Sequence, residues 1–148
     1  MSTYTQIIYQ IVFSTKNRLN TLSKNNRPKL FEYVIGILKN NKCHVYCING
    51  VDDHIHIITH LHPTVALAWL VKDIKLASSS FIKDRSVFKG FNGWQEGYGA
   101  FTYSIKEKPS LIAYVSNQEE HHRKISYKEE FIGLLNEHGV EFDERYLL

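Results

Sequence analysis

Residues 43–62, CHVYCINGVDDHIHIITHLH, decide the fold because two strand-like segments stand on either side of a short turn. Residues 43–49 and 54–62 are rich in β-branched and aromatic residues, which favour strands. Residues 50–53, GVDD, have the composition of a turn. Two strands joined by so short a connection predict an antiparallel hairpin.

The second of these strands alternates strictly between two kinds of side chain. Side chains two positions apart on a strand point to the same face of the sheet. One face carries Ile55, Ile57, Thr59 and Leu61, which we expect to pack on the core, and the other carries four histidines. The histidines are His54, His56, His60 and His62. Two neighbouring imidazoles can ligate a metal, although the alternation alone does not select one pair among the four.

The segments around the hairpin complete a recognisable order. Residues 4–13 predict a strand, and Ser23 is placed to cap a helix that runs to about Asn41, with Pro28 in its early part. A helical pattern follows Pro63, and residues 98–105 predict a short strand. The order β-α-β-β-α-β predicts an α+β, ferredoxin-like fold, in which two helices cover one face of an antiparallel sheet.

Two further helices are expected at the carboxyl end, over residues 109–122 and 127–138. Tyr114 and Gln118 are four residues apart in the first of them and therefore share one face. A plain amphipathic helix would also place them there, but an amide that faces a core needs a partner, and a metal is one candidate. If this helix packs beside His54 and His56, two nitrogens and an amide oxygen could hold a metal next to a phenol.

Asp52 and Asp53, just before the histidines, could orient an imidazole through its second nitrogen.

Length and composition limit the remaining possibilities. A chain of 148 residues fits one domain, residues 1–148. A net charge of +3 and a pI near 8.8 are compatible with a polyanionic partner without indicating one.

Cys43 and Cys47 are expected to be buried, reduced thiols, with a disulfide or a zinc site as the alternative. The sequence has neither a signal-peptide pattern nor a membrane-length apolar run, so we expect a cytoplasmic protein that makes no membrane contact.

The glycine-rich stretch GWQEGYGAF, residues 93–101, allows two interpretations. Interleaved aromatic rings can stack on the bases of a single strand. The same rings can instead pack onto the core, and composition does not separate the two.

Three motifs in order carry a family resemblance. They are His54-Ile55-His56 after Asp52-Asp53, then residues 94–101 (WQEGYGAF), then residues 114–122 (YVSNQEEHH). Together they closely resemble the HUH-type single-tyrosine transposases of bacterial insertion sequences that move as single-stranded DNA, the IS200-like transposases. The resemblance extends over nearly the whole chain.

The resemblance implies a complete set of roles. His54, His56 and Gln118 match the family's ligands for a divalent metal ion, Mg²⁺ or Mn²⁺, and Tyr114 matches its nucleophile. The enzyme would cleave and rejoin single-stranded DNA at transposon ends through a 5′-phosphotyrosine, recognising hairpins near those ends. It would act as a homodimer in which the tyrosine helix of one protomer can complete the site of the other. It would act at the nucleoid of a bacterial or archaeal cell.

Basic side chains are expected to follow the DNA backbone. The main candidates are Lys16, Arg18, Lys72, Lys75, Arg85, Arg123 and Lys124, and Lys83, Lys106 and Lys108 are further ones. Three alternative functions remain at this point. They are a non-catalytic module that binds single-stranded nucleic acid, a metal-dependent hydrolase that uses water, and a domesticated relative that acts on palindromes in genomic repeats.

Overall fold

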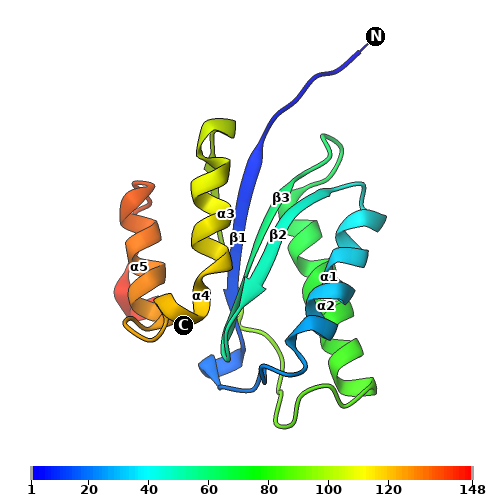
Figure 1. The fold of residues 1–148 in the computed structure, drawn as a ribbon, viewed down its shortest axis with the longest axis vertical. Coiled ribbons are helices and arrows are strands. Elements are labelled where there is room, and N and C mark those ends of the chain that lie inside the picture. Colours follow the sequence, from blue (N-terminus) through cyan, green and yellow to red (C-terminus); the bar gives the residue numbers. More distant parts are fainter. Residues whose placement is uncertain (1, 148) are drawn as a thin grey trace.

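The computed structural model describes residues 2–147, and within them an antiparallel sheet lies between two layers of helices (Figure 1). The strands are β1 (Ile8–Ser14), β2 (His44–Gly50), β3 (His54–His60) and β4 (Gly99–Tyr103). Their spatial order is β2-β3-β1-β4, with every neighbouring pair antiparallel. This is the sheet of a ferredoxin-like βαββαβ unit, and the predicted fold class is confirmed.

The first face of the sheet carries the main apolar core. The helices α1 (Arg27–Asn40) and α2 (Leu67–Asp84) pack on it. Ile55 and Ile57 of β3 belong to this core, as the alternation predicts. The first helix begins at Arg27 rather than at Ser23, with Pro28 in its first turn, where the missing N–H of proline leaves no helical hydrogen bond unmade.

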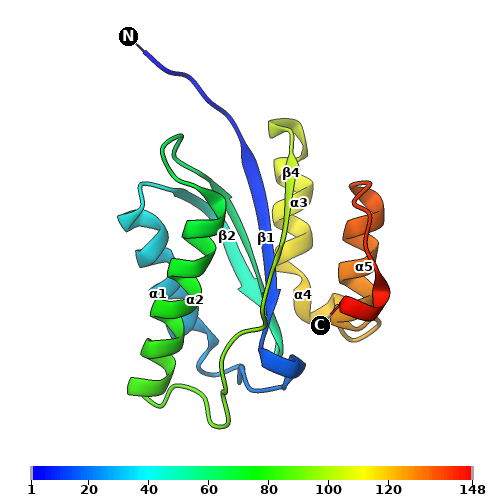
Figure 2. The same ribbon diagram turned by 180° about the vertical axis from the view of Figure 1, so that it is seen from behind.

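The second face is covered as well, by helices from the carboxyl end of the chain. They are α3 (Lys108–Ser116), α4 (Gln118–His121) and α5 (Tyr127–Glu137), which lie on the side of the sheet opposite α1 and α2 (Figure 2). The helix predicted over residues 109–122 is divided into α3 and α4, because the backbone at Asn117 departs from helical geometry, with φ −101° and ψ 25°. This second layer buries the histidine face of β3: the side chains of His54 and His56 are fully buried.

Short 3₁₀ turns at Lys16–Arg18, Ile105–Glu107 and Glu144–Tyr146 complete the regular structure of the described residues. No helix in residues 2–147 combines the length and apolar character needed to cross a membrane.

Two open points from the sequence are settled by packing. Trp94 of the glycine-rich segment is buried, lies edge-on to Phe13 at a centroid distance of 5.0 Å, and donates from Nε1 to the Ser78 hydroxyl at 2.9 Å. Its ring is therefore part of the core rather than a free stacking surface.

Cys43 and Cys47 are free thiols, the first buried and the second half-buried, so the expectation of reduced cysteines is confirmed.

The hairpin turn brings two backbone segments into close approach. Gly50 pairs with Ile55 across β2 and β3, and a Cβ at position 50 would collide with the His54 carbonyl oxygen. Only glycine fits there without moving the start of β3, from which both histidines project.

We predict that Gly50→Ala lowers the free energy of unfolding by about 1–3 kcal/mol, the usual cost of overpacking. The matched control is Gly36→Ala, because a Cβ on Gly36 of α1 would meet no atom within 4 Å. Alanine in a helix interior should stabilise that variant by up to about 1 kcal/mol. Urea denaturation of the three proteins measures both effects, and equal stability of Gly50→Ala and the parent would contradict the close approach.

A candidate metal centre beside a tyrosine

Side chains from β3 and from the carboxyl-terminal helices converge in one buried cluster. His54 and His56 project from β3, Gln118 opens α4, and Glu130 comes from the first turn of α5. The first three are fully buried and Glu130 is 4% exposed. His122, which follows α4, completes the group. The structure therefore brings together His54, His56 and Gln118, the set that the family resemblance implies, and adds two residues that the sequence analysis missed.

One carboxylate oxygen lies at the centre of this cluster. Glu130 Oε1 is 3.2 Å from His54 Nε2, 2.9 Å from His56 Nε2 and 3.0 Å from His122 Nε2. Gln118 Oε1 lies 3.3 Å from His54 Nε2, and its amide nitrogen donates to Glu130 Oε2 at 3.2 Å. Three imidazoles and an amide thus surround one acidic side chain.

The opposite nitrogen of each imidazole meets an acceptor. His54 Nδ1 is 2.7 Å from Asp53 Oδ1, and His122 Nδ1 is 2.9 Å from the carbonyl oxygen of Ile125. His56 Nδ1 is 2.7 Å from Gln10 Oε1. Carboxylate and carbonyl oxygens only accept, and Nε2 of each ring faces Glu130, so a neutral ring can donate to only one of its two acceptors. The expected orienting role of an aspartate before the histidines therefore falls to Asp53.

Asp52 has a different partner. The buried Arg27 guanidinium forms an ion pair with Asp52 at 2.6 Å and donates to the Leu22 carbonyl at 2.7 Å. The same guanidinium lies 3.5 Å from Glu119 of α4. Arg27 therefore ties the hairpin turn to the layer of helices that carries Gln118.

These contacts show that the cluster suits a cation. If the ring protons reside on Nδ1, the Nε2 lone pairs of three histidines face a carboxylate oxygen, and acceptors that face one another repel. A positive charge at their meeting point removes the repulsion. The ligand atoms of His54, His56, His122 and Glu130 all lie within 4.8 Å of one another, so this His/Glu group could hold a metal ion.

The pKa values of the buried histidines and of Glu130 reflect two opposing effects: burial, which disfavours a charged form, and nearby charged or hydrogen-bonding groups, which favour it. Burial lowers the pKa of His56 to about 4, with the nearby Glu130 only partly opposing it. Burial also disfavours the charged form of His54, but hydrogen bonds to Asp53 and Glu130 outweigh it and leave the pKa raised. Burial alone would raise the pKa of Glu130, yet the hydrogen bonds from His122, His54 and His56 hold it far below its ordinary value. Glu130 is therefore an anion in this cluster.

Tyr114 reaches the same carboxylate from the other side. It projects from α3, and its hydroxyl donates to Glu130 Oε2, with His121 Nε2 at 3.4 Å. The Tyr114 ring centroid is 6.0 Å from that of His56 of the same chain. Burial, followed by the charge of Glu130, raises the pKa of Tyr114 above its ordinary value. The phenol is thus placed beside the candidate metal centre but held in its neutral form.

Two hollows reach the cluster from different directions. A cavity of about 480 Å³ between α3 and α5 is lined by Tyr114 and Glu130, and three further glutamates, Glu107, Glu129 and Glu137, make it acidic. A second hollow of about 300 Å³ is lined by His122 and Tyr127 and carries charges of both signs. They are Arg27 and Arg123, and Asp52, Asp53 and Glu119. The first hollow has four glutamates and no lysine or arginine, so the second hollow repels an anionic strand less than the first.

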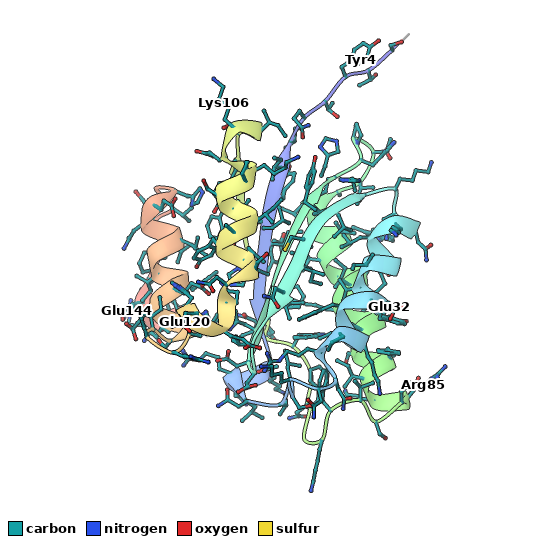
Figure 3. All side chains as sticks on the ribbon, viewed as in Figure 1. Tyr4, Glu32, Arg85, Lys106, Glu120 and Glu144 are labelled. Atoms are coloured by element: carbon teal, nitrogen blue, oxygen red, sulfur yellow. The ribbon has the colours of Figure 1, made fainter. Side chains whose placement is uncertain are left out.

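The predicted DNA-binding side chains do not gather on one surface. Lys16, Arg18, Arg123 and Lys124 are exposed at the turns that follow β1 and α4. Lys72 and Arg85 are exposed on the α2 side of the molecule, behind the sheet. Lys75 donates to the backbone carbonyls of Gln95 and Gly97 and is half-buried. Figure 3 shows Lys106 and Arg85 at opposite corners of the molecule.

The other histidines of the β3 face have local partners. His60 Nδ1 accepts from the Ile7 backbone N–H at 3.1 Å, and His62 Nδ1 lies 2.7 Å from the Thr64 hydroxyl. The structure therefore selects His54 and His56 among the four candidates. Glu130 did leave one signal in the sequence, because it falls in the buried stripe of α5 between Tyr127 and Leu134.

Comparisons with known proteins bear on the family and on the fold. The profile of the family described as "Transposase IS200 like" matches residues 3–118. A protein of Deinococcus radiodurans R1 assigned as a transposase has a similar solved structure, with a TM-score of 0.59 and 23% identity over 80% of this chain and 95% of that one. A REP-associated tyrosine transposase bound to a REP hairpin gives a TM-score of 0.60 at 15% identity, over 82% and 74% of the two chains. No curated protein matches the sequence.

The hydrogen bond from His56 to Gln10 generates a test of the cluster. Gln10→Leu removes the acceptor of a buried imidazole N–H, which should lower the free energy of unfolding by about 1–3 kcal/mol. His56 should then populate the tautomer protonated at Nε2, which ¹⁵N NMR of the ring detects. Gln6→Leu, at an exposed position of the same amino-terminal segment, serves as control. An unchanged His56 spectrum in Gln10→Leu would contradict the orienting role of Gln10.

Proposed function

The chain belongs to the IS200-like transposase family, and on that premise we propose that it cleaves and rejoins single-stranded DNA through a covalent bond to Tyr114. One observation carries the proposal. The Tyr114 hydroxyl and the imidazoles of His54 and His56 contact the same carboxylate, although they are far apart in the sequence. A nucleophile and a cation-binding set therefore lie within reach of one phosphate group.

His54, His56 and Gln118 are the residues that we propose to hold a divalent ion, Mg²⁺ or Mn²⁺. Two neutral imidazoles and an amide oxygen leave coordination positions open, which suits such an ion. When bound, the ion would polarise a phosphate and stabilise the charge that develops on it. Asp53 and Gln10 hold the two rings with Nε2 directed at the site.

The proposed reaction exchanges one phosphodiester for another. Tyr114 gives up its phenolic proton, its oxygen forms a bond to phosphorus, and the bond from phosphorus to the 3′ oxygen breaks. The departing 3′ oxygen takes up a proton and becomes a hydroxyl, while the 5′ phosphate stays on the tyrosine. Because ester replaces ester, no nucleotide triphosphate is needed, and attack by a 3′-hydroxyl reverses the step.

Structured single strands are the proposed substrate. The similar transposase bound to a REP hairpin supports this choice of ligand. Among the predicted basic residues, Arg123 lines the second hollow, so it is the first candidate for a phosphate contact, with Lys16, Arg18 and Lys124 as further ones. Lys72, Lys75 and Arg85 would require DNA that also reaches the α2 side of the sheet. The protein is further proposed to act as a single domain, residues 1–148, in a homodimer at the nucleoid of the cytoplasm.

We predict that the protein forms an adduct with a single-stranded hairpin substrate in the presence of Mn²⁺, and that the adduct survives denaturing electrophoresis. Tyr114→Phe should abolish it, because phenylalanine keeps the ring and lacks the oxygen. Tyr33→Phe is the matched control, since Tyr33 lies on α1, on the opposite side of the sheet. Cutting without an adduct, unaffected by Tyr114→Phe, would instead indicate a hydrolase that uses water.

The position of Tyr114 also favours a site built within one chain. Its hydroxyl already meets Glu130 of its own protomer, so no exchange of helices is needed to assemble the cluster. We therefore predict that mixing His54→Ala with Tyr114→Phe protein restores no cleavage above the level of either alone. Recovery of cleavage in verified mixed dimers would show that the tyrosine acts on its partner's site.

A further inference from the structure

The cluster contains two overlapping sets of metal ligands. The set proposed for catalysis is His54, His56 and Gln118. The second set is His54, His56, His122 and Glu130, whose ligand atoms all lie within 4.8 Å of one another. Both sets use the same two imidazoles, so they exclude each other.

His122 has the features of a ligand rather than of a bystander. Its Nδ1 is bound to the Ile125 carbonyl at 2.9 Å, and its Nε2 faces Glu130 Oε1 at 3.0 Å. Its side chain is 9% exposed. Metal-bound histidines commonly hold their second nitrogen to an acceptor in this way, which fixes the ring and directs the free lone pair to the ion. The ring of His122 also lies 4.4 Å from that of His54, measured between centroids.

The donor chemistry of this second set selects a different ion. Three imidazoles and one carboxylate match the nitrogen-rich, four-coordinate sites of Zn²⁺, whereas Mg²⁺ prefers oxygen donors and retained water. Ligands at zinc distances stand about 3.3 Å apart at the corners of a tetrahedron. The distances from Glu130 Oε1 to the three nitrogens, 2.9–3.2 Å, are close to that spacing.

We propose that His54, His56, His122 and Glu130 form a closed Zn²⁺ site that holds the enzyme in an inactive state. Four protein ligands leave no position for a DNA phosphate. The second oxygen of the same carboxylate accepts the Tyr114 hydroxyl, so the nucleophile is restrained by the residue that closes the site. Zn²⁺ would thereby fasten α5 against β3 and compete with the catalytic ion for the two shared histidines.

The coordination set can be tested without DNA, and only the inhibitory consequence rests on the function proposed above. Zn²⁺ titration of the full-length apoprotein by calorimetry should show one site. Glu130→Gln and His122→Phe each remove one of four ligands and should weaken Zn²⁺ binding by at least about 100-fold, beyond the effect of losing an outer partner. Gln118→Ala removes only a hydrogen-bond partner of Glu130, so its effect should stay within the about 10–100-fold typical of losing an outer partner.

Two matched controls separate ligation from general effects. Glu137→Gln alters an exposed carboxylate on the same helix, and His60→Phe alters a histidine on the same face of β3. Both should bind Zn²⁺ like the parent. Co²⁺ gives an independent readout, because a tetrahedral ion absorbs visible light strongly and an octahedral one weakly. The parent should show the strong bands, and His122→Phe should lose them while keeping its folded circular-dichroism spectrum.

Inhibition is measured as loss of the Mn²⁺-supported adduct when Zn²⁺ is added. The parent should lose the adduct at Zn²⁺ concentrations that saturate the site, and His122→Phe should resist Zn²⁺ relative to its own activity without it. A Zn²⁺ affinity that depends on Gln118 and not on His122 or Glu130 would overturn the proposed ligand set. Zn²⁺ that supports cleavage would overturn the inactive state. Absence of any adduct with any ion would contradict the proposed function instead, while the calorimetry still decides the ligand set.

Discussion

The meeting of three imidazole nitrogens at one oxygen of Glu130 is the contact on which the site depends. A buried carboxylate without partners is strongly unfavourable, so Glu130 can sit 4% exposed only because His54, His56 and His122 face it. Those four side chains come from β3, from the segment after α4 and from α5. The contact therefore fixes how the carboxyl-terminal helices lie on the sheet, and with them the position of Tyr114. Apolar packing of Leu134, Leu135 and Tyr127 on Val12 and Phe101 supports the same placement without specifying it to the atom.

The chemistry of the tyrosine follows from this arrangement. A phenol next to a buried anion is harder to ionise, and burial adds to the effect, so Tyr114 as described is a poor nucleophile. A cation on the imidazoles changes the sign of the local field, because it offsets the charge of Glu130 and lowers the energy of a phenolate. Placement of the nucleophile and its activation are thus separate events. The fold accomplishes the first, and the second requires an ion and a substrate phosphate.

Local pattern was sufficient for much of this structure and failed at identifiable places. The short turn between two strand-like segments predicted the hairpin. Alternation along residues 54–62 predicted the core face of β3, since a strand has only two faces and one was apolar. The i, i+4 spacing placed Gln118 with Tyr114 even though Asn117 divides the helix, because a single kink rotates the two side chains too little to separate them. His122 and Glu130 were missed. Their role depends on the path of the chain between α4 and α5, which residue spacing does not encode. The burial of the histidine face was missed for the same reason. The helices α1 and α2 alone would leave that face of the sheet exposed, and α3, α4 and α5 must pack on it to bury the histidines.

The βαββαβ unit and the carboxyl-terminal helices supply different parts of the proposed site, so the fold alone says little about activity. The βαββαβ unit is a general scaffold, and structures with the same architecture at 23% and 15% identity share its shape. Of the proposed site, that unit supplies two imidazoles and the acceptors that orient them, Gln10 and Asp53. The carboxyl-terminal helices supply the nucleophile, the amide ligand and the two residues that could close the site. Small shifts of α5 would therefore exchange an open, oxygen-containing ligand set for a closed, nitrogen-rich one around the same two histidines. If the two proposed ligand sets both form, the ion that binds, rather than any change in the sheet, would decide whether Tyr114 is free to act.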